Sequence, residues 1–233
     1  MDTSTIDIVT LLPGPVRERA VALGADLCDR MLAAGVEPAF TLGSPFPGAG
    51  PDEVCEPHVS LFMLEVATDD LPEVTAALAD VARTHAPFPA TGTHASHNPQ
   101  GAPELFFEVT EQWRGLQRDV VDRIETLRRG RLRPADPAGE SVAGLIRDST
   151  DPDQVRQLTR YGYDEVHDAD ADRFRPHVTL AWPAKRRPAE ESSDLSGHLP
   201  ADALDHVVSE LAVALMHPYG TCTAIRSRSG LAG

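Results

Sequence analysis

The sequence predicts an α+β fold, because strand-like and helix-like hydrophobic patterns are interspersed along its 233 residues. Roughly eight short apolar or alternating runs are typical of strands, and several longer runs repeat their apolar residues at helical spacing. Gly- and Pro-rich stretches separate these segments. The chain contains neither a Walker-type phosphate loop nor a Gly-x-Gly-x-x-Gly motif, so neither of these two nucleotide-binding motifs explains its function.

The first part of the chain is predicted to begin with a strand and a helix. Residues 5–12 alternate and stop at Pro13 and Gly14, which is typical of a strand followed by a turn. Residues 15–34 carry apolar side chains at helical spacing, and Gly35 marks the helix end. The next predicted segments are a short strand near Ala39, a loop over 43–51, a strand over 58–67 and a helix that Asp69 or Asp70 caps and that runs to about His85.

The clearest helix of the remaining chain covers residues 111–129, where Trp113 and Leu116 begin a buried apolar stripe. The chain is predicted to close in a hairpin around Tyr219. The other predicted segments are strands over 88–96, 103–110 and 174–182, short helices over 141–148 and 152–161, a surface loop over 185–197, and hairpin strands over 210–216 and 221–227.

The formal net charge of −15 limits the class of partner. A protein that binds long nucleic acid non-specifically neutralises backbone phosphates and is expected to carry a basic face. This acidic chain repels polyanions overall, so we do not expect long nucleic acid as a partner. If the substrate contains phosphate, we expect a small phosphorylated or nucleotide molecule.

Composition also indicates location and cofactor use. No apolar run approaches the roughly 18 residues of a membrane helix, and the N-terminus is acidic where a secretory signal is basic, so we expect a cytoplasmic protein without a membrane partner. Cys28, Cys55 and Cys222 are too scattered to predict a disulfide framework or a zinc site, and we expect no metal and no cofactor. The single lysine, Lys185, among many arginines suggests a bacterial genome of high GC content. The oligomeric state is left open.

One short sequence occurs twice. Residues 56–61 (EPHVSL) return as residues 175–180 (RPHVTL), and each copy opens an apolar run that is typical of a strand. A third His-x-Ser triplet begins at His94, but it lacks the flanking Pro, Val and Leu. We read His94 and His97 as surface or loop residues.

The spacing within the repeat predicts a shared face. Side chains at positions i and i+2 of a strand point to the same side, so His58 projects with Ser60 and His177 projects with Thr179. Two such pairs would place two acid/base groups beside two hydroxyl groups. One neutral histidine can then take a proton from an attacking hydroxyl while the other, protonated, gives one to the leaving oxygen. The hydroxyls can stabilise charge on the phosphate oxygens.

These two motifs, about half a chain apart, resemble the signature of the 2H phosphoesterase superfamily, which includes the 2′-5′ RNA ligase-like proteins and cyclic nucleotide phosphodiesterases. The turn around Tyr219 in the closing hairpin is also similar to that group. The resemblance implies one domain over residues 1–233, in which two pseudo-symmetric antiparallel β-sheet lobes with outer helices face each other across a central cleft. It implies His58 and His177 as catalytic residues, with Ser60 and Thr179 binding the phosphate.

The resemblance further implies a phosphoric diester hydrolase that works without a metal on a small cyclic phosphate or a 2′-5′ linkage. Two other function classes stay open. One is a module that binds a nucleotide without turnover, although the complete motifs argue against it. The other is a biosynthetic enzyme that uses the same cleft for a non-phosphate reaction. Turnover of 2′,3′-cyclic nucleotides would separate these classes.

Further residues are candidates for the site, each with a structural alternative. Phe62 shares the predicted face of His58 and can stack on a base, but a buried aromatic is the reading we favour. Tyr161, Tyr163 and Tyr219 are candidate substrate contacts. Arg175 can bind phosphate oxygens in a bidentate manner, or it can pair with the acidic residues before it. The acidic run that follows His167 is read as a solvated loop, because its spacing does not fit a calcium site.

Overall fold

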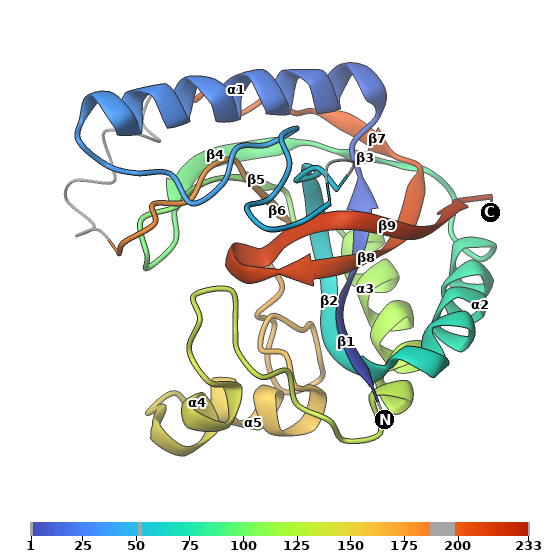
Figure 1. Ribbon diagram of the computed structural model, residues 1–233. Coiled ribbons are helices and arrows are strands. Elements are labelled where there is room, and N and C mark those ends of the chain that lie inside the picture. The colour runs from blue at the N-terminus through green and yellow to red at the C-terminus, as the bar shows by residue number, and fades with distance from the viewer. Residues whose placement is uncertain (1, 51–52, 187–198, 233) are drawn as a thin grey trace.

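The computed structural model describes residues 2–50, 53–186 and 199–232, and it confirms an α+β fold built on antiparallel sheets (Figure 1). The largest sheet has the strand order β2-β1-β8-β9. All neighbouring strands in it are antiparallel. Its strands are β1 (Thr3–Leu11), β2 (His58–Ala67), β8 (Glu210–His217) and β9 (Thr221–Gly230).

The second copy of the repeat belongs to a smaller sheet with the antiparallel order β4-β5-β6. A third, two-stranded sheet pairs β3 with β7. The two sheets that carry the repeat therefore differ in size. The strands of these smaller sheets are β3 (Phe88–Ala90), β4 (Gly92–His97), β5 (Pro103–Phe107), β6 (His177–Thr179) and β7 (His206–Val208).

The helices lie outside the sheets (Figure 1). Helix α1 lies across the β4-β5-β6 sheet, and a Cβ atom on its Gly24 would come within 2.7 Å of the Leu180 carbonyl oxygen. Glycine at this position therefore allows the helix to approach the end of the second motif. The helices are α1 (Gly14–Ala33), α2 (Leu71–Ala82), α3 (Glu111–Ile124), α4 (Val142–Asp148) and α5 (Pro152–Tyr161), with short 3-10 turns at Thr68–Asp70, Glu125–Arg128 and Pro218–Gly220.

A large hydrophobic core cluster holds these layers together, and a second, small cluster includes Val9 and Leu11 of β1 and Ala212 and Ala214 of β8. Helices α2 and α3 pack on β2, β8 and β9 of the large sheet, and the strands β2 and β6 approach each other. Trp113, predicted to begin the apolar stripe of its helix, is fully buried and meets Phe88 edge-on at a ring distance of 5.1 Å. Burial of large side chains such as these contributes about 1.5–3 kcal/mol each to folding.

Several predicted elements differ from the structure, for reasons of strand pairing. The strand expected near Ala39 is reduced to a single bridge between Pro38 and Pro183. The strand expected over 88–96 is divided, because β3 pairs with β7 while β4 pairs with β5. The strand expected over 174–182 keeps only three residues in β6, and β7 was not predicted.

The expected helix cap also differs. Asp70 precedes helix α2 but makes no capping hydrogen bond, since its carboxylate binds Arg129 at 3.0 Å.

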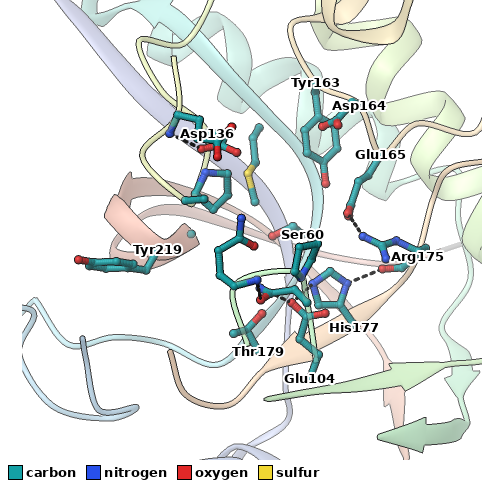
Figure 2. A pocket seen from close by; sticks show the side chains of 18 of the residues that line it. Ser60, Glu104, Asp136, Tyr163, Asp164, Glu165, Arg175, His177, Thr179 and Tyr219 are labelled. Atoms are coloured by element: carbon teal, nitrogen blue, oxygen red, sulfur yellow. Dashed lines mark hydrogen bonds and ion pairs between the residues drawn. The ribbon is translucent and has the colours of Figure 1, made fainter. Parts of the chain in front are cut away.

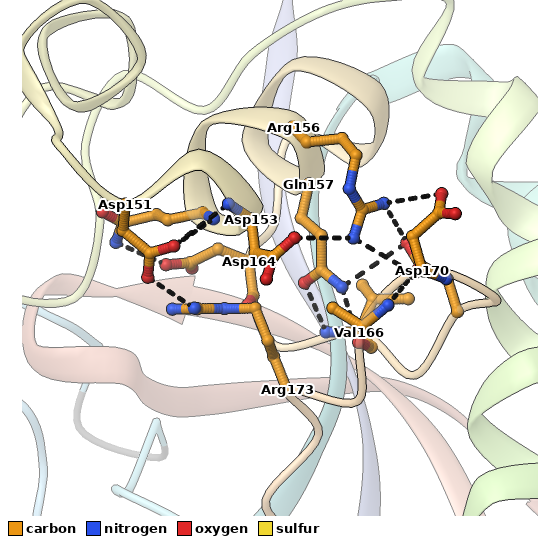
Figure 3. Close-up of polar contacts among 11 residues, drawn as sticks. Asp151, Asp153, Arg156, Gln157, Asp164, Val166, Asp170 and Arg173 are labelled. Carbon is orange, nitrogen blue, oxygen red and sulfur yellow. Dashed lines mark hydrogen bonds and ion pairs between the residues drawn. The ribbon is translucent and has the colours of Figure 1, made fainter.

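The acidic run that follows His167 belongs to a network of paired charges and is not simply a solvated loop (Figure 3). Arg156 of helix α5 binds Asp168 at 2.6 Å and Asp170 at 3.5 Å. Arg173 binds Asp151 at 2.6 Å. Although burial opposes it, the Arg156 hydrogen bond holds the pKa of Asp168 well below its usual value. The network fixes the segment that leads into β6, which positions the residues before His177.

Two further expectations concern the chain as a whole. None of the helices in the described ranges has the length and apolar character needed to cross a bilayer. All three cysteines are free and buried. The loop predicted over 185–197 lies outside the described residues, apart from its first two positions.

Candidate active site

Both copies of the repeat line one cavity of about 580 Å³ (Figure 2). Strand β2 is the edge strand of the large sheet and β6 is the edge strand of the smaller one. The two edge strands approach each other, so the cavity lies where the sheets meet. His58, Ser60, His177 and Thr179 all belong to its lining. The structure therefore brings together the four residues that the repeat predicted.

The two imidazoles are held in the same way by their own strands. His58 Nδ1 lies 2.7 Å from the carbonyl oxygen of Glu56, and His177 Nδ1 lies 2.6 Å from that of Arg175. Since a carbonyl oxygen only accepts, each Nδ1 carries the proton and donates. In a neutral ring this leaves Nε2 as an acceptor, so each strand fixes both the tautomer and the orientation of its histidine.

Each Nε2 atom faces a buried carboxylate on the neighbouring strand. His58 Nε2 lies 3.8 Å from Asp7 Oδ2, and His177 Nε2 lies 3.7 Å from Glu104 Oε1. Both distances exceed a hydrogen bond, and the charge of Glu104 acts on the His177 ring. Asp7 is fully buried on β1, and Glu104 is buried on β5 with Asn98 donating to it at 3.0 Å.

Electrostatics make the two histidines unequal. Burial lowers the pKa of His58, and the hydrogen bond to Glu56 only partly offsets this effect. Burial also acts to lower the pKa of His177, but the charges of Glu104 and Glu165 outweigh it and raise the pKa above the usual value. At neutral pH the His58 ring is therefore the neutral one, and His177 is the more readily protonated.

The Ser60 hydroxyl is engaged by a carboxylate instead of being free for a ligand. Ser60 Oγ donates to Asp7 Oδ2 at 2.6 Å. Burial raises the pKa of Asp7 to about 7, although this hydrogen bond opposes the shift. When Asp7 is protonated it can donate to Ser60 Oγ, which frees the hydroxyl proton for an anion in the cavity. Thr179 sits directly across from Glu104 in the β5–β6 pairing.

Phe62 does not face the cavity. The pairing of β1 with β2 shifts between Ile8 and Val9, so that Ile8 sits across from Phe62 and Val9 across from Ser60. This bulge reverses the alternation of side chains after Ser60. Phe62 is fully buried and packs edge-on against Tyr163 at a ring distance of 6.1 Å, while Met63 takes the place on the cavity wall. The candidate base contact is corrected to a core residue.

Arg175 lines the cavity and binds a carboxylate at the same time (Figure 2). Its guanidinium forms an ion pair with Glu165, which belongs to the acidic segment before it. About half of the Arg175 side chain stays exposed. Arg175 therefore pairs with an acidic residue before it, as the structural alternative expected, and it also lies at the cavity beside the second motif, as the phosphate-binding reading expected.

The candidate tyrosines are distributed differently. Tyr219 and Tyr163 line the cavity, whereas Tyr161 is buried outside its lining and stacks with Arg160. Trp182 also lines the cavity, with its ring 5.9 Å from that of Tyr219. His94 and His97 lie on strand β4, outside the lining of this cavity, and they line a smaller hollow.

Sequence reasoning missed Asp7 and Glu104, although each left a signal. Asp7 stands between the buried apolar residues Ile6 and Ile8 of β1, and Glu104 stands in the buried strand β5. A carboxylate in the interior of a buried strand is costly unless it interacts with a partner, so such a position indicates a specific role. The pattern alone did not say that the partners are the two motifs.

One group of side chains, of which His58 lines the cavity and two lie buried behind it, could hold a metal ion. Asp7, His58 and Cys222 offer ligand atoms that lie within 4.8 Å of one another. Cys222 Sγ lies 3.5 Å from His58 Nε2. Within the described ranges this is the one such group, and the scattered cysteine spacing gave no sign of it.

Comparison with solved structures shows which fold this is. The chain superimposes on Escherichia coli LigT over the whole of both chains, with a TM-score of 0.53 and 13% identity. TT0787 of Thermus thermophilus matches over 98% of both chains with a TM-score of 0.54 and 20% identity. A structure described as a phosphoesterase matches over both full lengths with a TM-score of 0.52 and 15% identity. No protein-family model and no curated protein matches the sequence.

Proposed function

From the fold that the chain shares with E. coli LigT and with the structure described as a phosphoesterase, which is the fold that the 2H resemblance implied, we propose that the protein is a metal-independent phosphodiesterase. It opens a small cyclic phosphate, or cleaves a 2′-5′ phosphodiester, by two-histidine acid/base catalysis. The observation that carries the proposal is the pair of imidazoles on one cavity, with Nδ1 fixed in the same way and with opposite pKa shifts.

In the proposed reaction His58 is the base and His177 is the acid. Neutral His58 accepts a proton at Nε2 from an attacking water, whose oxygen forms the new bond to phosphorus. Protonated His177 gives its Nε2 proton to the leaving sugar oxygen as the old P–O bond breaks. Positioned proton transfer of this kind is worth roughly 10²–10⁴-fold in rate.

The remaining residues of the site support the phosphate and the nucleoside. The hydroxyls of Ser60 and Thr179 donate to non-bridging oxygens, where charge accumulates in the transition state. The guanidinium of Arg175 faces the same phosphate from the start of the second motif. Tyr219 and Trp182 form an aromatic wall against which a base can stack.

The structural neighbours fit a small nucleotide substrate. Structures of E. coli LigT exist in complex with 3′-AMP, phosphate, NADP+ and ATP. Hydrolysis of a 2′,3′-cyclic phosphate gives a nucleoside monophosphate of the 3′-AMP type. A small ligand also suits a chain whose net charge of −15 disfavours a long polyanion.

The direct test is a panel of the four nucleoside 2′,3′-cyclic phosphates and of 2′-5′ and 3′-5′ dinucleotides, followed by ³¹P NMR. We expect turnover of at least one cyclic phosphate or 2′-5′ linkage, and loss of that turnover in His58→Ala and His177→Ala. Tight binding of a panel member without any turnover would instead identify a nucleotide-binding module. If no member of the panel is bound or turned over, the proposal is refuted.

A further inference from the structure

Arg133 is a buried cation on the wall of the same cavity. It lies in the loop that leads to helix α4 and is only 2% exposed. Its Nη1 lies 3.6 Å from Met63 Sδ, and its guanidinium carbon lies 5.7 Å from the centre of the Tyr163 ring. Its Nε is buried and has no hydrogen-bond partner among the described residues. The cation is thus held by a sulfur and an aromatic ring, which cannot neutralise its charge.

The other arginines of the cavity wall are paired. Arg173 binds Asp151, and Arg175 binds Glu165. Arg133 forms no ion pair with a carboxylate of the described ranges, and Asp7, Asp136 and Asp164 act on it only at longer range. Burial lowers its pKa, which reports the cost of keeping this charge away from water. A buried ion without a partner destabilises a protein unless something binds to it.

We propose that Arg133 binds a second anionic group of the substrate, a phosphate distinct from the one that is cleaved. This inference rests on the proposed function and specifies its substrate class. The planar guanidinium, with Tyr163 against its face, presents donors that match two oxygens of a phosphate. Such a ligand would neutralise the buried charge.

The distance between the two subsites indicates the kind of molecule. Met63, which Arg133 contacts, follows Ser60 by three positions on β2. A strand rises about 3.3 Å per residue and the bulge after Ser60 shortens this path, so the two positions lie roughly 7–10 Å apart, which suits one nucleoside with a phosphate at each end. The substrate class is therefore a nucleoside 2′,3′-cyclic phosphate that carries a further phosphate at its 5′ position.

The surrounding acids limit the second subsite to a single group. Asp136, Glu140 and Asp164 line the same part of the cavity. Their charges would repel a chain of phosphates that continued past Arg133. The acidic wall thus favours one terminal phosphate over a polyphosphate or a longer strand.

The test compares adenosine 2′,3′-cyclic phosphate with the same compound carrying a 5′-phosphate. In the wild-type protein we expect the 5′-phosphate to raise kcat/KM by about 10- to 100-fold, mainly through KM, as hydrogen bonds to a charged group do. Arg133→Met should erase this preference. Arg160→Met is the matched control, because Arg160 also stacks on a tyrosine, at 4.9 Å from Tyr161, but lies outside the cavity lining.

Equal kcat/KM for the two compounds in the wild-type protein would overturn the proposal, whether or not a variant folds. So would a preference that persists in Arg133→Met. If neither compound is turned over, the proposed function fails. The role of Arg133 is then tested by comparing the affinities of two nucleotides. Adenosine 3′,5′-bisphosphate should then bind the wild-type protein at least tenfold more tightly than 3′-AMP, and equal affinities would reject the second subsite.

Discussion

His58 and His177 stand in the same relation to their own backbones, each donating from Nδ1 to the carbonyl oxygen two residues earlier. The two contacts, 2.7 and 2.6 Å long, differ little although the strands belong to different sheets. A proline lies between histidine and carbonyl in both copies, at Pro57 and Pro176. Proline fixes φ near −65°, so it helps to hold the carbonyl in place beside the ring.

Replacing either His58 or His177 with Ala should lower turnover by about 10²–10⁴-fold, because each variant loses one positioned proton-transfer group. The double variant should lose much less than the product of the two single losses, since the pair acts as a unit. Steady-state kinetics on an active substrate measure both effects. Near-normal turnover in either single variant would remove that histidine from the mechanism.

A matched control for these variants is His206→Gln. His206 Nδ1 makes the same contact, 2.7 Å from the carbonyl oxygen of Leu204, but His206 lies outside the cavity. This variant should keep its turnover. A phosphodiester substrate with a p-nitrophenolate leaving group does not need a proton on that group. Turnover of this substrate should be restored in His177→Ala and stay absent in His58→Ala. The opposite pattern would make His177 the base and His58 the acid.

The pH profile of kcat/KM should be bell-shaped and broad, because the pKa of His58 is lowered and that of His177 is raised. Activity falls in acid as His58 becomes protonated and falls in alkali as His177 loses its proton. Glu104→Gln removes a charge that raises the pKa of His177, so the alkaline limb should move to lower pH. Glu108→Gln, an exposed neighbour on the chain, should leave the limb in place.

Asp7 should make the stability of the protein depend on pH. Its folded pKa of about 7 lies above the unfolded value of about 3.9, so between these values the folded state holds the extra proton. The free energy of unfolding therefore loses this contribution as pH rises from about 4 to 7. The side chain of Asp7→Asn cannot titrate. In urea unfolding, the free energy of unfolding of this variant relative to wild type should therefore rise by on the order of a few kcal/mol across that range. A difference that does not change with pH would contradict the shift.

Activity should survive exhaustive chelation, because the proposed site already contains an acid, a base and anion donors. Turnover after dialysis against EDTA, with and without added zinc or manganese, measures this. Loss of activity that a metal restores would make His58, Asp7 and Cys222 ligands, since their donor atoms lie within 4.8 Å of one another. His58 would then be unable to act as the base.

Arg175→Lys and Arg175→Ala should both raise KM or lower kcat substantially, because lysine cannot reproduce a bidentate contact to phosphate. Arg123→Lys is a suitable control, since Arg123 is exposed and binds Asp80 outside the cavity. Wild-type kinetics in both Arg175 variants, with a change only in thermal stability, would leave Arg175 as the structural partner of Glu165.

Local sequence predicted much of the fold because local patterns determine much of it. Strand β2 occupies residues 58–67 as expected, since an apolar run there begins directly after a proline. The division of β3 from β4 was not predictable, because it depends on pairing with β7, more than 100 residues later. Periodicity predicts that a segment is extended and leaves its partner strand undetermined.

The candidate site was predicted where residues are close in sequence and missed where the fold brings them together. The spacing of His58 and Ser60 follows from strand geometry, and both do line the cavity. The same rule failed for Phe62, because the bulge after Ser60 depends on how β1 pairs with β2. The contact of Cys222 with His58 joins positions far apart in the chain, so no local pattern reports it.

The order β2-β1-β8-β9 also bears on how the protein is made. Strand β1 pairs with β8, and roughly 200 residues separate the two along the chain. At a ribosomal rate of about 5–20 residues per second, β8 emerges about 10–40 s after β1. During that interval one edge of the β1–β2 pair, which carries the first motif, has no partner strand. The nascent chain is thus exposed to mispairing until its last hairpin is synthesised, and chaperones that shield unpaired strand edges should matter most in this interval.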